Sequence, residues 1–454
     1  MEEYLNLLLE QIRYQKARPV IREELQSHME EQIEANLAAG MSAMEAQKEA
    51  VRDMGSPKEA GIALDKIHRP KNAWGMIGFM AALTITAIVI QSMLGTHGFA
   101  RYAVLSFVVM LAVCYFDYTL IGRFAKITAG AFCVLCIFGI CQRNYVNGMS
   151  YCIRLGFLNV SLFSFMMLYV PLYGAVLYQC SRDHKEKMLL SKETDGKFQM
   201  LYRKYKDLVK AFFWMAFPVW IALRIPSISL AFMLLLSMSI LLTIVLCKGW
   251  FDLKARRIVA ALWSVILLVP AALLGIFWRS LPVYQTDRLK AFVTGGGSAN
   301  YLTNVLRECV KNGRLFGGER QELSQKLPDL NSGFLYTYLS SGYGMILGIA
   351  LCTVLAALLI RTFVICLKLK NRLGMIMGLG SVLILGINVM INILENMGLF
   401  PLSQTFLPFF SAGGSCILVC YTLMGIILSV YRYKNVYSVH VHTKRPKIRM
   451  TIDL

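Results

Sequence analysis

Residues 398–415 read GLFPLSQTFLPFFSAGGS and link one long apolar segment, 374–397, to another, 409–431. Prolines and a glycine pair at the mouth of an apolar helix interrupt its backbone hydrogen bonds, and hydrocarbon cannot satisfy the freed groups. These groups need partners from the protein, from water or from a polar ligand at the lipid surface. The segment therefore predicts either a tight turn between closely packed helices or a polar site at one membrane surface.

Composition indicates an all-α, polytopic membrane protein. Mean hydropathy is +0.54 and 56% of the residues are apolar, and several apolar runs are long enough to cross about 30 Å of hydrocarbon. We predict about ten spans, near residues 74–93, 101–120, 127–141, 158–178, 210–224, 227–247, 258–278, 336–366, 374–397 and 409–431. The third and fifth of these are short for a full crossing, so we expect them to extend into the residues on either side.

The positions of lysine and arginine predict the orientation. With a cytoplasmic N-terminus, the main groups of cations all fall on the cytoplasmic side, at 182–210, 248–257, 368–372 and 432–449. The 280–335 loop then lies outside and is long enough to carry its cations across. The formal net charge of +20 is thus mainly a topology signal, with attraction to anionic lipids in addition. Nucleic-acid binding is disfavoured, because the basic residues are dispersed and form no reading module.

The first seventy residues differ in charge from the rest of the chain. They hold 13 acidic residues against 9 Lys and Arg, a net charge of −4, whereas the remainder carries +24. Apolar residues recur at helical spacing, Ser42 with Glu45 predicts a capping box, and a short helix at 58–68 leads into the membrane. The acidic, amphipathic start predicts no signal peptide. We predict a cytosolic helical domain at 1–70, a transmembrane domain at 71–435 and a basic cytosolic tail at 436–454.

Motifs in the predicted outer loops resemble those of one membrane-protein family. Residues 398–415 follow the pattern G-L-L-P…L-P-F-x-S-x-G-G-S apart from Ala412, and residues 147–156 resemble N-G-A-x-R-W-I-x-x-G with Cys152 at the tryptophan position. Residues 287–292 and 312–317 resemble R-L-x-x-F and S-G-G-L-F-G. These are motifs of the SEDS family, the group of RodA, FtsW and SpoVE. The first seventy residues resemble the helical prefix found ahead of some permeases and SEDS proteins in Gram-positive bacteria.

The resemblance implies a SEDS fold and a role in peptidoglycan synthesis during elongation, division or sporulation. Family members resemble glycosyltransferases that join lipid II units at the outer membrane face, where a sugar 4-hydroxyl attacks and polyprenyl pyrophosphate leaves. The implied partners are lipid II, membrane lipids and a class B penicillin-binding protein. The chemistry is metal-independent or metal-assisted, so a divalent cation stays open as a cofactor.

The sequence departs from the family pattern at a position taken as essential for catalysis. Residues 327–336, LPDLNSGFLY, align with L-P-E-x-H-T-D-F-I-F, so the position of the aspartate taken as essential for polymerisation is Gly333. A hydroxyl nucleophile gains roughly 10²–10⁴-fold from a general base. Asp329, at the position of the motif's glutamate, is either a relocated base or a solvated loop carboxylate. Glu395, near the outer end of the ninth span, is either functional or a helix-end carboxylate that reaches water.

Candidates for substrate binding come from cations and from the last outer loop. Arg154 and Arg288 offer bidentate contacts to a pyrophosphate, and Arg288 lies within a matching motif. A spaced trio, Arg307, Lys311 and Arg314, has the same chemistry or forms only a solvated helix face. No Cys or His grouping has zinc spacing, so no metal ligand is predicted. The resemblance adds five loop residues: Pro408, Ser411, Gly413, Gly414 and Ser415.

Three functions follow as alternatives. The first is a SEDS-type peptidoglycan glycosyltransferase. The second is a catalytically inactive SEDS protein that binds lipid-linked precursor or partner proteins and regulates envelope synthesis. The combined loss of the family's aspartate, tryptophan and glutamate positions, which are Gly333, Cys152 and Ser340–Ser341 here, favours it. The third is a transporter for a lipid-linked sugar, suggested by polar breaks near membrane ends. The third has the least support, because the sequence shows no inverted repeat and few buried charges.

Overall fold

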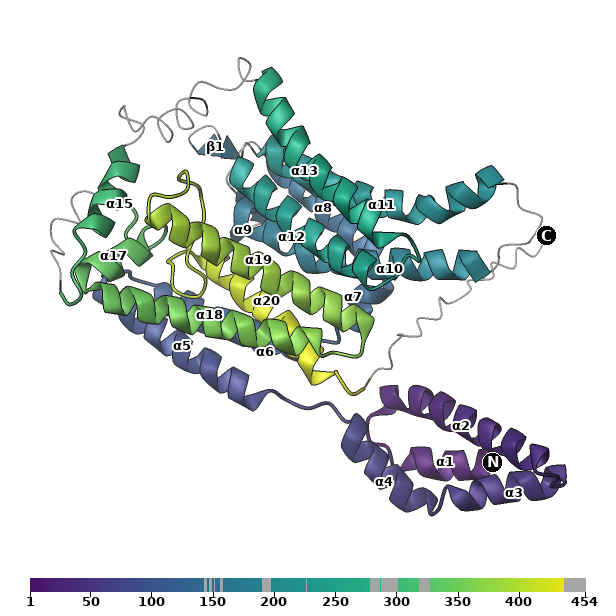
Figure 1. Ribbon diagram of the computed structural model, residues 1–454. Helices are drawn as coiled ribbons and strands as arrows, with labels where there is room; N and C mark the ends of the chain where they lie inside the picture. Colours follow the sequence, from purple (N-terminus) through teal and green to yellow (C-terminus); the bar gives the residue numbers. More distant parts are fainter. Residues whose placement is uncertain are drawn as a thin grey trace, which may run out of the picture.

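The computed structural model is almost entirely helical (Figure 1). It describes residues 1–142, 145–146, 149–150, 152–155, 158–189, 197–225, 227–277, 286, 301–317 and 327–436. Among these residues, six helices are long and apolar enough to cross a membrane, and two shorter helices, Phe99–Tyr115 and Ala125–Cys141, are also apolar. The predicted all-α, multi-pass membrane fold is confirmed.

The membrane bundle begins with α5 and ends with α20. We name its two ends by what lies there: α5 begins at the prefix end, and the loop between α19 and α20 lies at the loop end. The helices described in it are α5 (Trp74–Met93), α6 (Phe99–Tyr115), α7 (Thr119–Arg123), α8 (Ala125–Cys141), α9 (Leu162–Met167), α10 (Tyr169–Leu189), α11 (Lys197–Arg224), α12 (Ile228–Cys247), α13 (Ala255–Phe277), α15 (Tyr301–Lys311), α17 (Leu335–Gly342), α18 (Met345–Leu367), α19 (Arg372–Asn396) and α20 (Gly414–Arg432).

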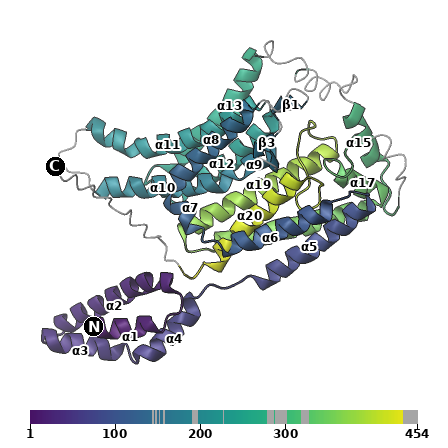
Figure 2. The same ribbon diagram turned by 180° about the vertical axis from the view of Figure 1, so that it is seen from behind.

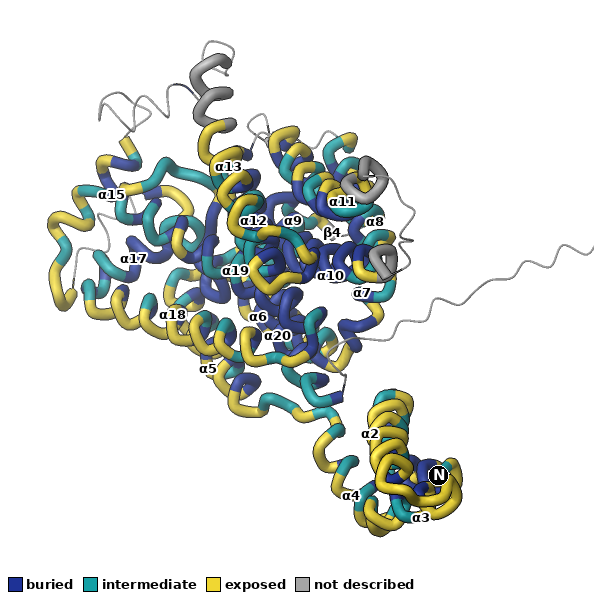
Figure 3. Tube along the Cα trace, turned by 45° about the vertical axis from the view of Figure 1, so that its right-hand side comes forward, coloured by how far each residue is buried: buried dark blue, intermediate teal, exposed yellow. Residues whose placement is uncertain are grey.

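The centre of the bundle is formed by α10, α19 and α20 (Figure 3). Glycines let these helices approach closely. A Cβ atom at Gly174 of α10 would lie 2.9 Å from the carbonyl oxygen of Ile376 on α19, and one at Gly425 of α20 would lie 2.8 Å from that of Met110 on α6. Small residues at crossings are the usual means by which membrane helices pack. Seen from behind, α5 and α6 lie side by side, and α6 covers α20 (Figure 2).

Three predicted spans differ from the structure. The span predicted at 336–366 is broken into α17 and α18 at Gly344, whose φ of 122° strongly favours glycine. The first residues of the span predicted at 158–178 form a strand instead, because β4 (Leu158–Ser161) pairs antiparallel with β3 (Cys152–Leu155). The span predicted from 409 begins only at Gly414, since the preceding loop folds over the end of the bundle. A second small hairpin joins β1 (Tyr145–Val146) to β2 (Met149–Ser150).

The N-terminal residues form four helices, which we call the prefix helices: α1 (Glu2–Glu10), α2 (Arg18–Ala38), α3 (Ala43–Asp53) and α4 (Pro57–His68). A short 3-10 turn, Gln15–Ala17, precedes α2. The predicted capping box is confirmed, because the Ser42 side chain accepts from the Glu45 amide while the Glu45 side chain accepts from Ser42. Those hydrogen bonds from Ser42 hold the pKa of the Glu45 carboxyl below its usual value.

The prefix helices contact the bundle at its prefix end. Lys16 Nζ lies 2.8 Å from Asp117 Oδ2, in the link between α6 and α7. The ring of Tyr14 lies 6.1 Å from that of Tyr433, just beyond α20. The chain that enters α5 is also held there, because the Lys71 amide donates to the carbonyl oxygen of Arg432 at 3.0 Å.

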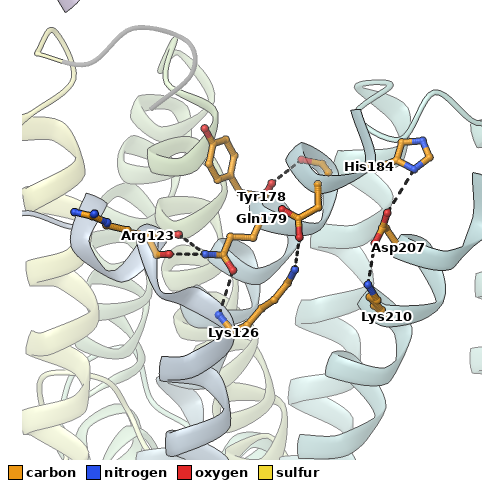
Figure 4. Close-up of polar contacts among 10 residues, drawn as sticks. Arg123, Lys126, Tyr178, Gln179, His184, Asp207 and Lys210 are labelled. Atoms are coloured by element: carbon orange, nitrogen blue, oxygen red, sulfur yellow. Dashed lines mark hydrogen bonds and ion pairs between the residues drawn. The ribbon is translucent and has the colours of Figure 1, made fainter. Parts of the chain in front are cut away.

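Polar side chains tie α7, α8 and α10 together at the same end (Figure 4). Gln179 Nε2 donates to the carbonyl oxygens of Gly122 and Arg123 at 3.0 and 2.8 Å. Lys126 Nζ pairs with Asp183 Oδ2 at 2.6 Å. The carbonyl groups that α7 frees at its end are thereby satisfied by a neighbouring helix, as a membrane bundle requires.

A second polar group joins α10 to α11 (Figure 4). Asp207 is fully buried, and its carboxylate lies 3.2 Å from Lys210 Nζ and 3.9 Å from His184 Nδ1. A buried carboxylate is tolerated only when it is paired. The group therefore fixes the paired ends of α10 and α11 beside the bundle.

Candidate functional site

The loop end of the bundle is closed by two loops that bond to each other. These are residues 397–413, between α19 and α20, and residues 327–334, before α17. The Ala412 amide donates to the Asn331 carbonyl oxygen at 2.6 Å. The Ser411 hydroxyl donates to the Ser332 carbonyl oxygen at 2.8 Å and accepts from the Leu407 amide at 2.8 Å. Both loops carry motifs of the sequence analysis, so the fold brings those motifs together.

Gln91, fully buried near the end of α5, forms hydrogen bonds to both loops. Its Nε2 donates to the carbonyl oxygen of Asn331 at 2.8 Å and to that of Phe410 at 2.7 Å. The Thr96 hydroxyl donates to Gln91 Oε1 at 2.9 Å. A glutamine with no exposed surface in an apolar helix is costly unless it is bonded in this way.

A row of asparagines on α19 supports the same loops. Asn388, Asn392 and Asn396 are four residues apart and therefore share one face of the helix. Asn388 Nδ2 donates to the Phe406 carbonyl oxygen at 2.8 Å. Asn392 and Asn396 both donate to the Gly333 carbonyl oxygen, at 3.2 and 3.0 Å. The side-chain oxygens of Asn388 and Asn392 are buried without a hydrogen bond in the described part of the chain.

Glu395 lies beside this row and is 4% exposed. Its carboxylate accepts hydrogen bonds from the hydroxyl groups of Ser403 and Thr405, the latter at 2.5 Å. Thr405 also accepts from Asn392, which links the acid to the asparagine row. No cation among the described residues pairs with Glu395. The prediction that Glu395 is a helix-end carboxylate that reaches water is wrong, because the outer loop covers its side chain.

Gly333 leaves space where the family pattern has its aspartate. A Cβ atom placed there would meet only the Thr405 carbonyl oxygen, at 3.9 Å. Thr405 binds Glu395, so a side chain at position 333 would point toward the same loop segment. Asp329 is different, since it is exposed, has a φ of 49°, and its carboxylate forms no hydrogen bond within the described ranges. The structure therefore brings Glu395, and not Asp329, into the polar cluster around Gly333.

Phe409 holds the last outer loop in an unusual backbone conformation. Its φ is 70°, a region that side chains other than glycine rarely adopt, and the residue is 3% exposed. Its ring meets Tyr421 edge to face at 5.4 Å, and the Tyr421 hydroxyl lies 2.5 Å from Thr84 Oγ1. Such strain of order 1–3 kcal/mol persists only where surrounding packing determines it.

The predicted substrate-binding residues fall into two groups. Pro408 and Ser411 are buried inside the loop, where they hold its shape. Gly413, Gly414 and Ser415 lie at its edge, with Gly413 exposed. Arg288 lies outside the described residues. The Arg307 Nε donates to the Gly398 carbonyl oxygen at 3.0 Å, so this cation is engaged by the loop and is not merely a solvated helix face.

The β3–β4 hairpin carries Arg154 on one strand and binds Ser415 through the other. Arg154 is exposed and pairs with Asn159 across the two strands. Ser415 Oγ donates to the Asn159 carbonyl oxygen at 3.3 Å and accepts from the Ser161 amide at 3.1 Å. Gln142 fixes the strand further, since it bonds both the amide and the carbonyl oxygen of Arg154. The backbone of Arg154 is thereby held one strand away from the residues that bind Ser415, at the start of α20.

An apolar cavity of about 260 Å³ opens beside the polar cluster, between α5 and α18. Ile90 precedes Gln91, and Phe410 is the residue whose carbonyl oxygen Gln91 binds, so the cavity and the cluster share a wall. Its lining is Phe79, Ala82, Leu83, Thr86, Ile90, Leu339, Leu347, Ala350, Leu351, Val354 and Phe410.

Metal binding finds no support in this geometry. Within the ranges that the structure describes, no three His, Cys, Asp or Glu side chains are grouped as a metal ion would require. Glu395 is bound by two hydroxyl groups and has no second carboxylate beside it among these residues. We therefore assign no step to a divalent cation.

The fold and the site define a class: multi-pass α-helical membrane proteins with a polar site closed by loops at one end of the bundle. Residues 72–436 match the family model of the cell cycle proteins FtsW, RodA and SpoVE, so the chain belongs to this family. The resemblance drawn from the motifs is confirmed.

Named relatives match over part of their length. The chain is 26% identical over 147 residues to a probable peptidoglycan glycosyltransferase FtsW of Caulobacter vibrioides, covering 32% of this chain and 38% of that protein. It is 33% identical over 130 residues to stage V sporulation protein E of Bacillus subtilis, covering 28% and 36%. With peptidoglycan glycosyltransferase MrdB of Escherichia coli, it shares 26% over 204 residues, covering 43% and 55%. The chain thus spans between about a third and a little over half of these curated relatives.

Solved structures show the same fold. One chain, from work described as the structural coordination of polymerization and crosslinking by a peptidoglycan synthase complex, superposes with a TM-score of 0.62 at 20% identity. The alignment covers 80% of this chain and 98% of that one. The rod shape determining protein RodA of Thermus thermophilus gives 0.54 at 15% identity, covering 80% and 97%. At these identities, the likeness concerns the fold alone.

Proposed function

We propose that the protein is a SEDS-type peptidoglycan glycosyltransferase that polymerises lipid II at the outer face of the cell membrane. The observation that carries this is the meeting of the two motif-bearing loops over a buried carboxylate, Glu395, with the open position 333 beside it. Membership of the family and the names of relatives such as MrdB support the reaction class.

The two sides of the site suit the two parts of a lipid-linked sugar. The apolar cavity between α5 and α18 suits a polyprenyl chain, because a binding pocket of this kind gains from burying apolar surface. The buried side-chain oxygens of Asn388 and Asn392 can accept hydrogen bonds from sugar hydroxyl groups. Arg154, which pairs across the hairpin with Asn159, the residue that Ser415 binds, offers a guanidinium to the pyrophosphate.

The proposed step is a displacement at the anomeric carbon of the donor. The acceptor 4-hydroxyl oxygen forms the new bond to that carbon while the bond to the polyprenyl pyrophosphate oxygen breaks. We assign the hydroxyl proton to the Glu395 carboxylate, and the leaving pyrophosphate carries away the electron pair. General-base help of this kind is worth roughly 10²–10⁴-fold. Glu395 is 4% exposed, so the 397–413 loop that covers it has to move to admit the acceptor hydroxyl.

A catalytically inactive SEDS protein is the second candidate. Gly333 has no titratable atom, and its carbonyl oxygen is already bound by Asn392 and Asn396. In this case the site holds a lipid-linked precursor or a partner without turnover and regulates envelope synthesis. A lipid-linked sugar transporter remains a weaker third.

We also propose a topology, a partner and a domain division. The N- and C-termini are cytoplasmic, because Lys126, Lys210, Arg372 and Arg432 gather at the prefix end. The resemblance of residues 1–70 to the prefix of some Gram-positive membrane proteins favours a Gram-positive cell membrane. Residues 1–70 form a separate domain ahead of the family region. A class B penicillin-binding protein is the partner, supported by a fold relative from a peptidoglycan synthase complex.

Lipid II polymerisation by the purified protein, alone and with candidate transpeptidases, tests the proposal. Glycan chains from the wild-type protein support the enzyme. Failure to form product alone and with every transpeptidase, together with saturable lipid II binding, would establish the inactive alternative. Translocation of labelled lipid II across liposomes without polymer would indicate the transporter.

A further inference from the structure

Four exposed residues of helix α11 lie on one line along its axis. They are Tyr202, Val209, Phe213 and Trp220, each between 53% and 63% exposed, and we call them the α11 stripe. The last three follow the first by seven, eleven and eighteen residues, so at 3.6 residues per turn they lie within about 20° of it around the axis. Phe217 joins the stripe, because its ring stacks on Phe213 at 5.8 Å and on Trp220 at 5.9 Å.

Part of the α11 stripe lies at the depth of the hydrocarbon. Tyr173, in the span Leu162–Lys185, donates from its hydroxyl to the carbonyl oxygen of Ala211 on α11 at 3.3 Å. Phe213 lies two residues further into the bundle, and α11 runs along the edge of the bundle in two opposite views (Figures 1 and 2). The exposed side of α11 at this depth therefore meets the acyl chains of lipids.

The other end of the α11 stripe lies at the level of the lipid headgroups. The same span ends at Lys185, and the neighbouring His184 Nδ1 lies 3.9 Å from Asp207 Oδ2 on α11 (Figure 4). Lys206 and Tyr202 lie one and five residues further out, at most about 8 Å along the helix axis. The polar layer of one leaflet is about 6 Å thick, so these two side chains lie within that layer or at its surface.

Cations gather beside the stripe at this level. Lys206 Nζ lies 4.9 Å from the centroid of the Tyr202 ring, a cation–π contact that keeps the ammonium group on the stripe. Arg203 and Lys210 lie three residues before Lys206 and four residues after it, so they share its side of the helix. Asp207 is the one acid in the sequence 202–210, and it is fully buried and turned inward. The lipid-facing side of α11 therefore carries positive charge at the headgroup level.

We propose that the α11 stripe and Lys206 bind an anionic phospholipid in the leaflet at the prefix end. The ammonium group of Lys206 contacts the headgroup phosphate, and an acyl chain lies along Val209 and Phe213. The hydrocarbon of one leaflet is about 15 Å thick, and the helix rises about 16 Å from Lys206 to Phe217. A zwitterionic lipid offers the same chain, but its own cation would lie beside Lys206, so a lipid of net negative charge is preferred. The polar cluster lies at the opposite end of the bundle, so this binding is independent of the proposed glycosyltransferase activity.

Photocrosslinking in nanodiscs identifies the lipid. Benzoylphenylalanine is placed by amber suppression at position 209 of the full-length protein, in discs of equal amounts of phosphatidylglycerol and phosphatidylcholine, and the lipid attached after irradiation is identified by its mass. Position 364 is the matched control, because Val364 is also exposed and lies near the prefix end of a span, α18. Lys206→Gln removes the charge and Lys206→Arg keeps it. Lys368→Gln, an exposed lysine at the end of α18, is the control for charge.

We expect at least about threefold more phosphatidylglycerol than phosphatidylcholine at position 209, and about equal amounts at position 364. Lys206→Gln should lower the ratio at 209 to that at 364, whereas Lys206→Arg and Lys368→Gln should leave it unchanged, with folding of each variant confirmed by its melting temperature. Equal ratios at 209 and 364 in the wild type overturn the proposal. A ratio that survives Lys206→Gln also overturns it, because the lysine then does not select the headgroup. Attachment of position 209 to protein instead of lipid overturns it as well, since a partner or a second copy then covers the stripe.

Discussion

Ser411 shows how much of the loop depends on single hydroxyl groups. It accepts from the Leu407 amide and donates to the Ser332 carbonyl oxygen, and it is 1% exposed. We predict that Ser411→Ala destabilises the protein by about 1–3 kcal/mol for each buried partner left unpaired. Thermal unfolding in detergent measures this. Thr353→Ala, on the exposed side of α18, is the control and should leave the melting temperature unchanged. Equal melting for both variants would contradict the role of Ser411.

Gly333 is the residue at which the chain departs most from its family's pattern. Because a Cβ there would meet only the Thr405 carbonyl oxygen, at 3.9 Å, we predict that Gly333→Asp folds without a cost from overpacking. Thermal unfolding and size-exclusion profiles check this. If the site is catalytically inactive for lack of an acid, the same variant gains lipid II polymerisation. Loss of folding would show that position 333 has no room for the family's side chain.

Helix α20 runs from the loop end of the bundle to its prefix end, since it begins at Gly414 and ends at Arg432. Its contact with α6 depends on Gly425, where a Cβ would lie 2.8 Å from both the Met110 carbonyl oxygen and Val113 Cβ. We predict that Gly425→Ala costs about 1–3 kcal/mol through overpacking. Gly386→Ala on α19 is the matched control, because its Cβ would meet only Leu359 Cδ1, at 4.0 Å. Unfolding of both variants in detergent gives the comparison, and equal stability would refute the close contact.

Hydropathy and turn residues predicted most of the helices but not the arrangement of the site. The span 74–93 and the capping box at Ser42 follow from local patterns, which the structure repeats. The break at Gly344 depends on Leu315 and Phe316, which approach it from a distant part of the sequence. The β3–β4 hairpin is local, since only Gly156 and Phe157 separate its strands, but the apolar residues of β4 read as the start of a membrane span. The row Asn388, Asn392 and Asn396 had a readable signal, namely polar residues four apart within an apolar span. Their partners in the 327–334 loop could not be read from that spacing.

At the scale of the whole molecule, the prefix helices are held to the bundle by few contacts. Lys16 pairs with Asp117 at 2.8 Å, although the Lys16 side chain is 56% exposed. The partner, Asp117, is buried and also accepts from the Thr119 hydroxyl. A second carboxylate at position 16 would therefore face a buried like charge, so a charge reversal should matter more than a deletion. We predict that Lys16→Glu loosens the prefix and speeds tryptic cleavage after Lys71 several-fold; the Arg69–Pro70 bond is not a tryptic site. Lys48→Glu is the control. Equal cleavage rates of the two variants would show that the Lys16–Asp117 pair does not hold the prefix helices to the bundle.

The central claim is that Glu395 and not Asp329 is the acid of a working site. The most direct measurement is the rate of lipid II polymerisation by the wild type, Glu395→Gln and Asp329→Asn, each confirmed as folded by its melting temperature. We predict product from the wild type, a loss of roughly 10²–10⁴-fold in Glu395→Gln, and less than a fewfold change in Asp329→Asn. A full rate in Glu395→Gln, or its loss in Asp329→Asn alone, would contradict the account.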